Sequence, residues 1–242
     1  MLMRELLTEI ETGFEFHDEL NPALWDGEAL HPEVKAALDK IAVTFIEYLG
    51  VQMSAVKDVV LTGSNCAFNW TSKSDVDLHI IVDMSKNDAC PACTGDFVRD
   101  CFQAKKSLWN DSHDVTVKGF PVELYAQDAA EQHISPGVFS LVTNGWVVSP
   151  KKVSPTFDDS AVQAKTMEFV AQIDDFIEGK SDDLSAMKEL KARIKKMRKA
   201  GLERAGIYST ENLAFKALRN GGHLGRLSDY EKGLEDKTLS LA

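Results

Sequence analysis

Two aspartates on one face of a short predicted strand are the residues of this chain whose types and spacing could do chemistry. Asp75 and Asp77 lie in the run Ser74-Asp-Val-Asp-Leu-His-Ile-Ile-Val82, and alternate residues of a strand point to the same side. Two ionised carboxylates side by side repel each other unless a cation lies between them. Mg²⁺ prefers such oxygen ligands and shares its coordination with substrate phosphates. The pair therefore predicts a site for metal-assisted phosphoryl transfer.

A glycine-serine pair precedes the aspartates and ends the strand predicted before them. Gly63 would let the backbone approach a ligand closely, and Ser64 offers a hydroxyl and an N–H group to a phosphate oxygen. Lys73 and Ser74 immediately precede the first aspartate. These two residues either contact the phosphates of a nucleotide as well or only close the loop.

This arrangement resembles the signature of the DNA polymerase β-like nucleotidyltransferase superfamily. That signature is a Gly-Ser or Gly-Gly turn after a strand, an Asp-x-Asp strand, and a third carboxylate on a later strand. Gly63 and Ser64 match the turn, and Asp75 and Asp77 match the metal-binding pair. Glu123, on a later predicted strand, matches the third carboxylate. The resemblance implies a mixed-sheet nucleotidyltransferase core that binds a nucleoside triphosphate with Mg²⁺ or Mn²⁺.

Three further segments resemble uncharacterised nucleotidyltransferases of tailed phages. They are Phe16-His-Asp-Glu-Leu-Asn-Pro-Ala-Leu-Trp-Asp26, Leu108-Trp-Asn110 and Glu211-Asn-Leu-Ala-Phe-Lys216. The resemblance implies a phage protein, which would act in the cytoplasm of the host cell.

We therefore predict an Mg²⁺-dependent nucleotidyltransferase, an enzyme that transfers a nucleoside monophosphate from a triphosphate such as ATP to an acceptor hydroxyl and releases pyrophosphate. Asp75 and Asp77 would hold the metal, while Glu123 would bind metal and align or deprotonate the acceptor hydroxyl. The acceptor could be RNA, a protein or a small molecule. Two alternatives stay open: a catalytically silent nucleotide-binding or toxin–antitoxin-type regulatory protein, and a metal-dependent phosphohydrolase.

The composition predicts a soluble cytoplasmic protein that is no general binder of DNA. The 242 residues have a formal net charge of −11, which disfavours polyanions and anionic membrane surfaces. The first residues lack the uninterrupted apolar core of a signal peptide. No apolar run approaches the roughly 20 residues of a membrane span.

The hydrophobic pattern predicts an α+β fold, with a mixed sheet, flanking helices and a C-terminal helical bundle. The predicted elements before residue 150 are helices over 1–12, 34–49 and 96–109, strands over 58–62, 76–82, 114–117 and 122–125, and a hairpin over 139–148. Ser149-Pro150-Lys-Lys-Val-Ser-Pro155 predicts a boundary. The expected domains are a catalytic core over 1–150 and a helical subdomain over 151–242, packed on the core, with helices near 159–178, 182–200, 209–219 and 227–233.

One predicted helix reverses the charge of the chain. The segment Met187 to Arg204 carries eight lysines or arginines against two glutamates. Its cations either contact a triphosphate or another polyanionic substrate, or they form a solvated face. The candidates for substrate contact are Lys195, Lys196 and Lys199, of which Lys195 and Lys199 are predicted to bind nucleotide.

Several other residues near the aspartates have alternative interpretations. His79, on the aspartate face, either polarises substrate or makes a structural hydrogen bond, and we favour the second. Phe68 and Trp70 either stack on a base or anchor the loop. Asp83 lies about 20 Å along the strand from Asp77, at about 3.3 Å per residue, so it cannot share the ion.

The cysteine pair Cys90-Pro-Ala-Cys93 has the spacing of half a zinc site. Cys101 and His113 are possible completions, although their spacing fits no familiar pattern. A redox pair is the other functional alternative. We interpret the pair as an incidental feature of a loop.

Overall fold

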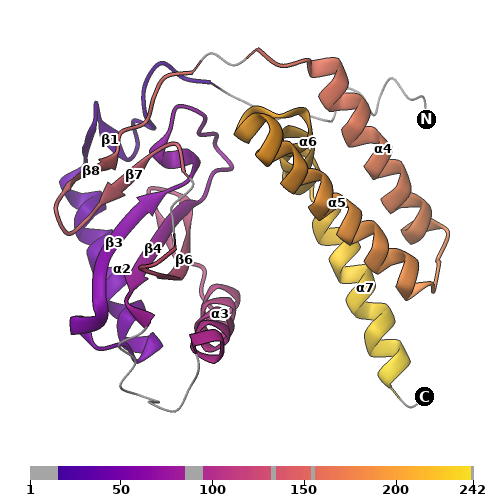
Figure 1. Cartoon of the computed structure of the whole chain (residues 1–242), viewed down its shortest axis with the longest axis horizontal. Coiled ribbons are helices and arrows are strands. Elements are labelled where there is room, and N and C mark those ends of the chain that lie inside the picture. Colours follow the sequence, from indigo (N-terminus) through magenta and orange to yellow (C-terminus); the bar gives the residue numbers. More distant parts are fainter. Residues whose placement is uncertain (1–15, 85–94, 132–134, 154–155, 241–242) are drawn as a thin grey trace. The chain divides into compact units, whose positions relative to one another are not determined.

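A computed structural model describes residues 16–84, 95–131, 135–153 and 156–240. The predicted helix over 1–12 and the pair Cys90 and Cys93 lie outside these residues. The chain divides into two compact units (Figure 1), whose described parts are residues 16–153 and 156–240. Within the described residues no helix is both long and apolar enough to span a membrane.

A six-stranded mixed sheet forms the centre of the first unit, in the order β5-β6-β4-β3-β7-β8. Only the β4–β6 pair is parallel, and the other neighbours in this sheet are antiparallel. The strands are β3 (Val56–Thr62), β4 (Val76–Val82), β5 (Thr116–Val117), β6 (Phe120–Asp128), β7 (Val138–Ser140) and β8 (Gly145–Val148). This mixed sheet with flanking helices, followed by a helical unit, confirms the predicted α+β fold class.

Strand β4 alternates as the sequence predicted, and this alternation fixes which face of the sheet can carry polar chemistry. Leu78 and Ile80 are fully buried in the hydrophobic core, whereas Asp77 and His79 are half-buried on the other face. The β-branched and apolar residues therefore hold the strand against the helices, and the polar residues stay available on the opposite side.

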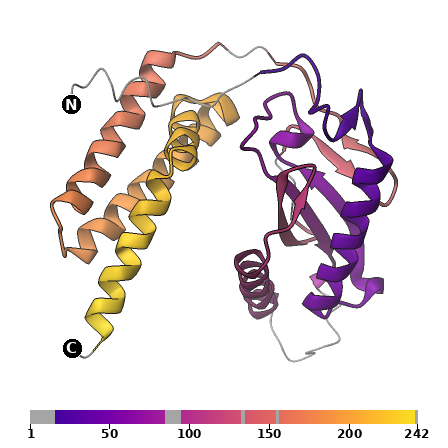
Figure 2. The same cartoon turned by 180° about the vertical axis from the view of Figure 1, so that it is seen from behind.

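Helices α2 (Pro32–Leu49) and α3 (Gly95–Ser112) supply the other half of this core. Figure 2 shows α2 in front of the sheet. Helix α2 begins with proline, whose fixed φ suits the first turn, and ends at Gly50, which adopts the left-handed conformation. Trp109 of α3 packs edge-on against Phe45 of α2, with ring centroids 5.5 Å apart.

Helix α3 also supplies hydrogen bonds to the backbone of β6. The side-chain amide of Asn110 donates to Leu124 O (3.1 Å) and accepts from Leu124 N–H (3.2 Å). Strand β5 is too short to pair with this part of β6, so an asparagine takes the place of a neighbouring strand. Helix α3 is longer than the predicted 96–109, and the added residues include Asn110, which makes this contact.

One hairpin forms an edge of the sheet, and a second hairpin packs against it. The predicted hairpin around Asn144-Gly145 is confirmed as β7–β8, and Asn144 has the positive φ (51°) of such a turn. A second hairpin, β1 (Trp25–Asp26) with β2 (Ala29–Leu30), packs on it. The rings of Trp25 and Trp146 stack with their centroids 4.8 Å apart.

The second unit consists of α4 (Asp159–Glu178), α5 (Leu184–Ala205), α6 (Thr210–Asn220) and α7 (His223–Leu239). The side chains of Asp158, Asp183 and Ser209 cap the first three of these helices. The predicted short helix near 227–233 is wrong in length, because α7 has 17 residues. Gly225 and Gly233 lower its helical propensity, and packing of residues such as Leu227 against the other helices outweighs that cost.

Candidate active site

The parallel pairing of β4 with β6 brings the three predicted carboxylates together. Asp77 of β4 lies directly beside Glu123 of β6 in the register of the sheet. Asp75 immediately precedes β4 and keeps the same parity. One ligand oxygen from each of the three residues lies within 4.8 Å of the others, and all three side chains are half-buried. Residues far apart in sequence thus form one acidic centre.

The donor set of this centre fits a hard divalent cation. An octahedral Mg²⁺ with oxygens at about 2.1 Å holds neighbouring ligand atoms about 3–4 Å apart. Oxygens of Asp75, Asp77 and Glu123 lie within 4.8 Å of one another, which is close to that spacing. Half-burial leaves the centre partly open to solvent, so water or another oxygen ligand could complete the coordination of an ion.

Gly63 at the end of β3 has a structural role beside the acidic centre that the sequence did not predict. Its φ of 79° and ψ of −163° lie in a region that essentially only glycine adopts. A Cβ atom at this position would lie 1.8 Å from Asp77 Oδ2. The glycine is therefore required where the turn passes the carboxylate of the acidic centre, in addition to any approach of a ligand.

The turn after Gly63 is the short 3₁₀ helix η2 (Ser64–Cys66), and its serine is tied to the loop before β4. Ser64 Oγ donates to Ser74 Oγ at 2.8 Å, and Ser74 Oγ also accepts from Thr71 N–H at 2.9 Å. Ser74 is also buried. These contacts favour the alternative in which Ser74 closes the loop and does not contact phosphates. Lys73 is exposed at the tip of the same loop.

Asn65 is a residue of the site that sequence reasoning missed. Its Nδ2 donates to Asp75 O at 2.7 Å, and its Oδ1 accepts from Asn21 Nδ2 at 2.8 Å. Trp25 Nε1 donates to Asn65 O at 2.8 Å. Asn21 and Trp25 both belong to the N-terminal segment 16–26, which the sequence analysis singled out, and this was the available signal. Through Asn65, this segment therefore stabilises the loop that carries Asp75.

The aromatic residues of this loop are anchors. The rings of His17 and Trp70 stack with centroids 3.8 Å apart. Trp70 Nε1 donates to Glu19 O at 3.1 Å, and His17 N–H donates to Phe68 O at 2.8 Å. Of the two alternatives for Phe68 and Trp70, these contacts favour anchoring over stacking on a base.

Tyr125 is a second missed residue, and it contacts the acidic centre directly. Its hydroxyl donates to Glu123 Oε2. Burial first, then the hydrogen bond to Glu123 and the charge of that carboxylate, raise the pKa of Tyr125 well above its ordinary value, so the hydroxyl remains a donor. Lys106 Nζ of α3 lies 3.9 Å from the centre of the Tyr125 ring. The parity of β6, which puts Tyr125 on the face of Glu123, was the available signal.

His79 completes the same face. Its Nδ1 lies 2.8 Å from Gln127 Oε1, and its ring stacks on that of Tyr125 with centroids 4.5 Å apart. These contacts agree with the structural hydrogen bond that we favoured for His79. The histidine therefore supports the ring of Tyr125, which in turn holds Glu123.

The remaining candidates are not part of this cluster. Within the described residues, the acidic triad is the one cluster of three or more potential metal-ligating His, Cys, Asp or Glu side chains. Cys101 is exposed, and His113 stacks on Trp109 with centroids 4.0 Å apart. Lys195 and Lys199 belong to α5 of the helical unit, where they line a groove.

Comparison with known proteins adds little to this geometry. No protein-family model matches the chain, and no curated protein matches it in sequence. Among solved structures, a STING-associated CdnE c-di-GMP synthase from Capnocytophaga granulosa is similar over 97% of this chain and 88% of that chain, with 12% identity and a TM-score of 0.25. That TM-score is too low to establish a common fold. The fold and the site define an α+β protein with a three-carboxylate centre on a mixed sheet.

Proposed function

We propose that the chain is a metal-dependent nucleotidyltransferase that moves a nucleoside monophosphate from a triphosphate to an acceptor hydroxyl. The observation that carries the proposal is the acidic centre, in which oxygens of Asp75, Asp77 and Glu123 lie within 4.8 Å of one another. The glycine turn beside it supports a phosphate-binding role, because the first N–H groups of a helical turn have no acceptor within the turn.

Each residue of the site has a distinct role in the proposed transfer. A divalent ion such as Mg²⁺, when bound by the carboxylates, supplies positive charge for the triphosphate and for the leaving pyrophosphate. The N–H groups of the Ser64 turn would donate to phosphate oxygens, and the Ser64 hydroxyl would do so once it leaves Ser74 Oγ. Glu123 orients the acceptor hydroxyl and accepts its proton. The acceptor oxygen bonds to the α-phosphorus as the bond from that phosphorus to the bridging oxygen of pyrophosphate breaks.

Incubation with α-³²P-labelled nucleoside triphosphates tests this proposal. With Mg²⁺ and a cell extract as the source of acceptors, we expect the label to enter an acceptor while pyrophosphate is released in equal amount. A chelator should stop both, since without a cation the carboxylates repel the triphosphate. Release of labelled monophosphate without an adduct would instead identify a phosphohydrolase.

Binding is measured separately by thermal unfolding. Mg²⁺ with the correct triphosphate should raise the melting temperature, because a ligand of the folded state at 100 times its Kd stabilises it by about 2.7 kcal/mol. Mg²⁺ alone should do little, since it holds its own waters until phosphates share its coordination. A shift without turnover would identify a silent nucleotide-binding protein. No shift with any ribo- or deoxyribonucleotide would contradict a nucleotide site.

Removal of the tyrosine hydroxyl should slow the transfer step. In Tyr125→Phe the ring still stacks on His79, but Glu123 loses the donor that orients it. We expect kcat to fall by about 10–100-fold, the cost of removing a partner that orients a metal ligand, with little change in the KM of the triphosphate. Steady-state kinetics measure both values.

Tyr48→Phe is the matched control for this variant. Tyr48 lies on α2 in the hydrophobic core, where its ring packs against Trp109. It should keep the wild-type kcat. An equal loss in both variants would mean that Tyr125 acts only through stability.

A further inference from the structure

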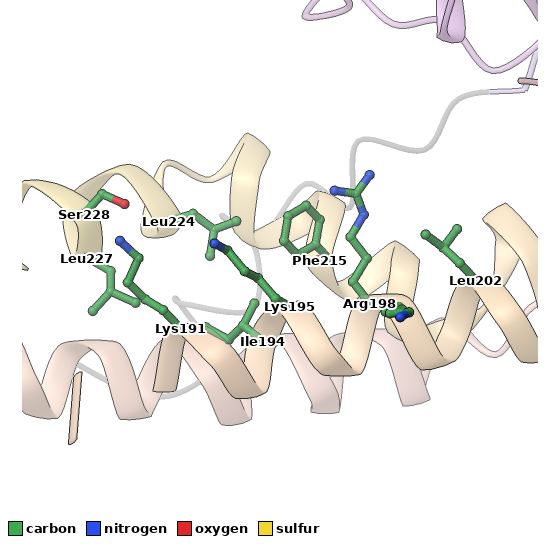
Figure 3. Close-up of a pocket in the computed structure, with 10 residues that line it drawn as sticks. Lys191, Ile194, Lys195, Arg198, Leu202, Phe215, Leu224, Leu227 and Ser228 are labelled. Atoms are coloured by element: carbon green, nitrogen blue, oxygen red, sulfur yellow. The ribbon is translucent and has the colours of Figure 1, made fainter. Parts of the chain in front are cut away.

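The helical unit contains a groove between α5, α6 and α7 with a volume of about 470 Å³. This volume lies within the usual range of ligand sites, about 300–1,000 Å³. Figure 3 shows its lining, which combines an apolar floor with the long cationic side chains of α5. The groove belongs to the helical unit, and the residues of the acidic centre belong to the first unit.

The floor of the groove is continuous with the core of the helical unit. Ile194 of α5 and Leu227 of α7 are almost fully buried at its base. Phe215 and Leu224 are half-buried and pack against the same core, and Leu202 extends the floor along α5. Apolar side chains that line a concave surface gain free energy when a partner removes them from water.

The rim is a stripe of four cations on one helix. Lys191, Lys195, Arg198 and Lys199 follow one another at helical spacing along α5 and all line the groove. Figure 3 shows Lys191, Lys195 and Arg198 extending from α5 toward the helices that carry Phe215, Leu224 and Leu227. This stripe contrasts with the net charge of −11 for the whole chain.

The cations of the rim are only partly neutralised. Lys191 pairs with Glu231, and Lys199 makes a long, exposed contact of 3.9 Å with Glu203. Within the described residues, neither Lys195 nor Arg198 has an ion pair with a carboxylate. The guanidinium of Arg198 instead lies 4.4 Å over the ring of Phe215. A partner that brings carboxylates to this rim would gain charge pairs that the free protein does not make.

We propose that this groove binds an acidic amphipathic helix of a partner protein, with apolar side chains on the floor and carboxylates at the rim. From Lys191 to Leu202 the lining extends about 16 Å along α5 at 1.5 Å per residue, which matches three turns of a facing helix. An amphipathic helix in an apolar groove is a common mode of peptide recognition. The charge of the rim selects acidic partners and rejects basic ones.

The same features disfavour a nucleic acid in this groove. Single strands are held by stacking of bases on exposed aromatic rings. Phe215 is the one aromatic residue of the lining, and Arg198 lies over its ring. The aliphatic remainder of the floor provides no face for a base. Lys195 and Lys199, which the sequence predicts to bind nucleotide, would contact the partner helix in this proposal.

Fluorescence anisotropy with a designed peptide tests the groove on the full chain. The probe is a labelled 14-residue helical peptide with leucines at positions i, i+3, i+4 and i+7 and glutamates beside them. We expect saturable binding that weakens at higher salt. Lys195→Glu should raise the Kd by at least 10-fold because it opposes the glutamates. Lys196→Glu, on the same helix but outside the lining, should change it by less than twofold.

Further probes separate the other occupants. A peptide with the leucines replaced by serine should bind at least 10-fold more weakly, and equal binding would mean that the rim recognises any anion. No binding of the leucine probe, or an unchanged Kd in Lys195→Glu, would overturn the proposal. Displacement of the probe by oligo(dT) or by a nucleoside triphosphate would overturn the proposal and assign the rim to nucleic acid or nucleotide. None of these outcomes depends on whether the acidic centre is active.

Discussion

Replacement of Asp77 or Asp75 by asparagine should abolish nucleotidyl transfer while the folded protein stays at least as stable. Each substitution removes one charge from the acidic centre and weakens the hold on the divalent ion. We expect turnover to fall by about 10³-fold or more, since loss of even one preorganised electrostatic group costs about 10²–10³ in kcat. Without metal, less repulsion remains among the three carboxylates, so the melting temperature should equal or exceed that of the wild type. Labelled transfer and thermal unfolding measure the two effects.

Asp83→Asn provides the matched control for both aspartates. Asp83 follows β4 directly, but its carboxylate lies 3.6 Å from Lys57 Nζ and belongs to no metal-ligand cluster of the described residues. The Asp83→Asn variant should keep full turnover. Loss of this weak ion pair should lower the free energy of unfolding by only about 0–1 kcal/mol. Near-wild-type transfer in both Asp75→Asn and Asp77→Asn would refute the role of the acidic centre.

The sequence could predict those parts of the site that local patterns encode. The alternation of β4 identifies its two faces, so it shows that Asp77 is directed away from the core. The same parity on β6 places Glu123 on a polar face. Both patterns repeat every two residues and need no knowledge of tertiary structure.

The rest of the site depends on pairings that local patterns do not contain. The parallel register of β4 and β6 puts Glu123 beside Asp77 and Tyr125 beside His79. No short-range signal specifies which strands become neighbours across a long connection. The buttress of Asn65 by Asn21 joins residues from separate loops in the same way. Tyr125 and Asn65 were therefore missed, although their residue types are ordinary for hydrogen-bonded partners of a site.

The groove of the helical unit illustrates the same distinction on helices. The spacing of Lys195 and Lys199 along α5 was visible in the sequence, and so was the excess of positive charge. The apolar floor requires Phe215 from α6 and Leu224 from α7 to meet α5. The extent of α7 was also underestimated from the sequence. Only the assembled helices distinguish Lys195, which lines the groove, from Lys196, which does not.

Gly63→Ala should lower both the stability and the activity of the protein. The backbone conformation of Gly63 alone costs a non-glycine residue about 1–3 kcal/mol. The new Cβ would also lie 1.8 Å from Asp77 Oδ2, so the carboxylate must leave the acidic centre. We expect the free energy of unfolding to fall by more than about 3 kcal/mol and transfer to be lost. Denaturant unfolding measures the first effect, and labelled transfer the second.

Two controls separate the cost of the unfavourable backbone conformation from the cost of the collision with Asp77. Gly27 also has a positive φ (60°), but a Cβ there meets nothing within 4 Å, so Gly27→Ala should cost only about 1–2 kcal/mol and spare activity. In an Asp77→Ala background the oxygen that collides with the new methyl group is absent. Gly63→Ala should therefore cost less stability there than in the wild type, with a coupling free energy of about 1–3 kcal/mol in a double-mutant cycle. Equal costs in both backgrounds would show that the glycine serves the turn alone, and that its contact with Asp77 does not hold the acidic centre in place.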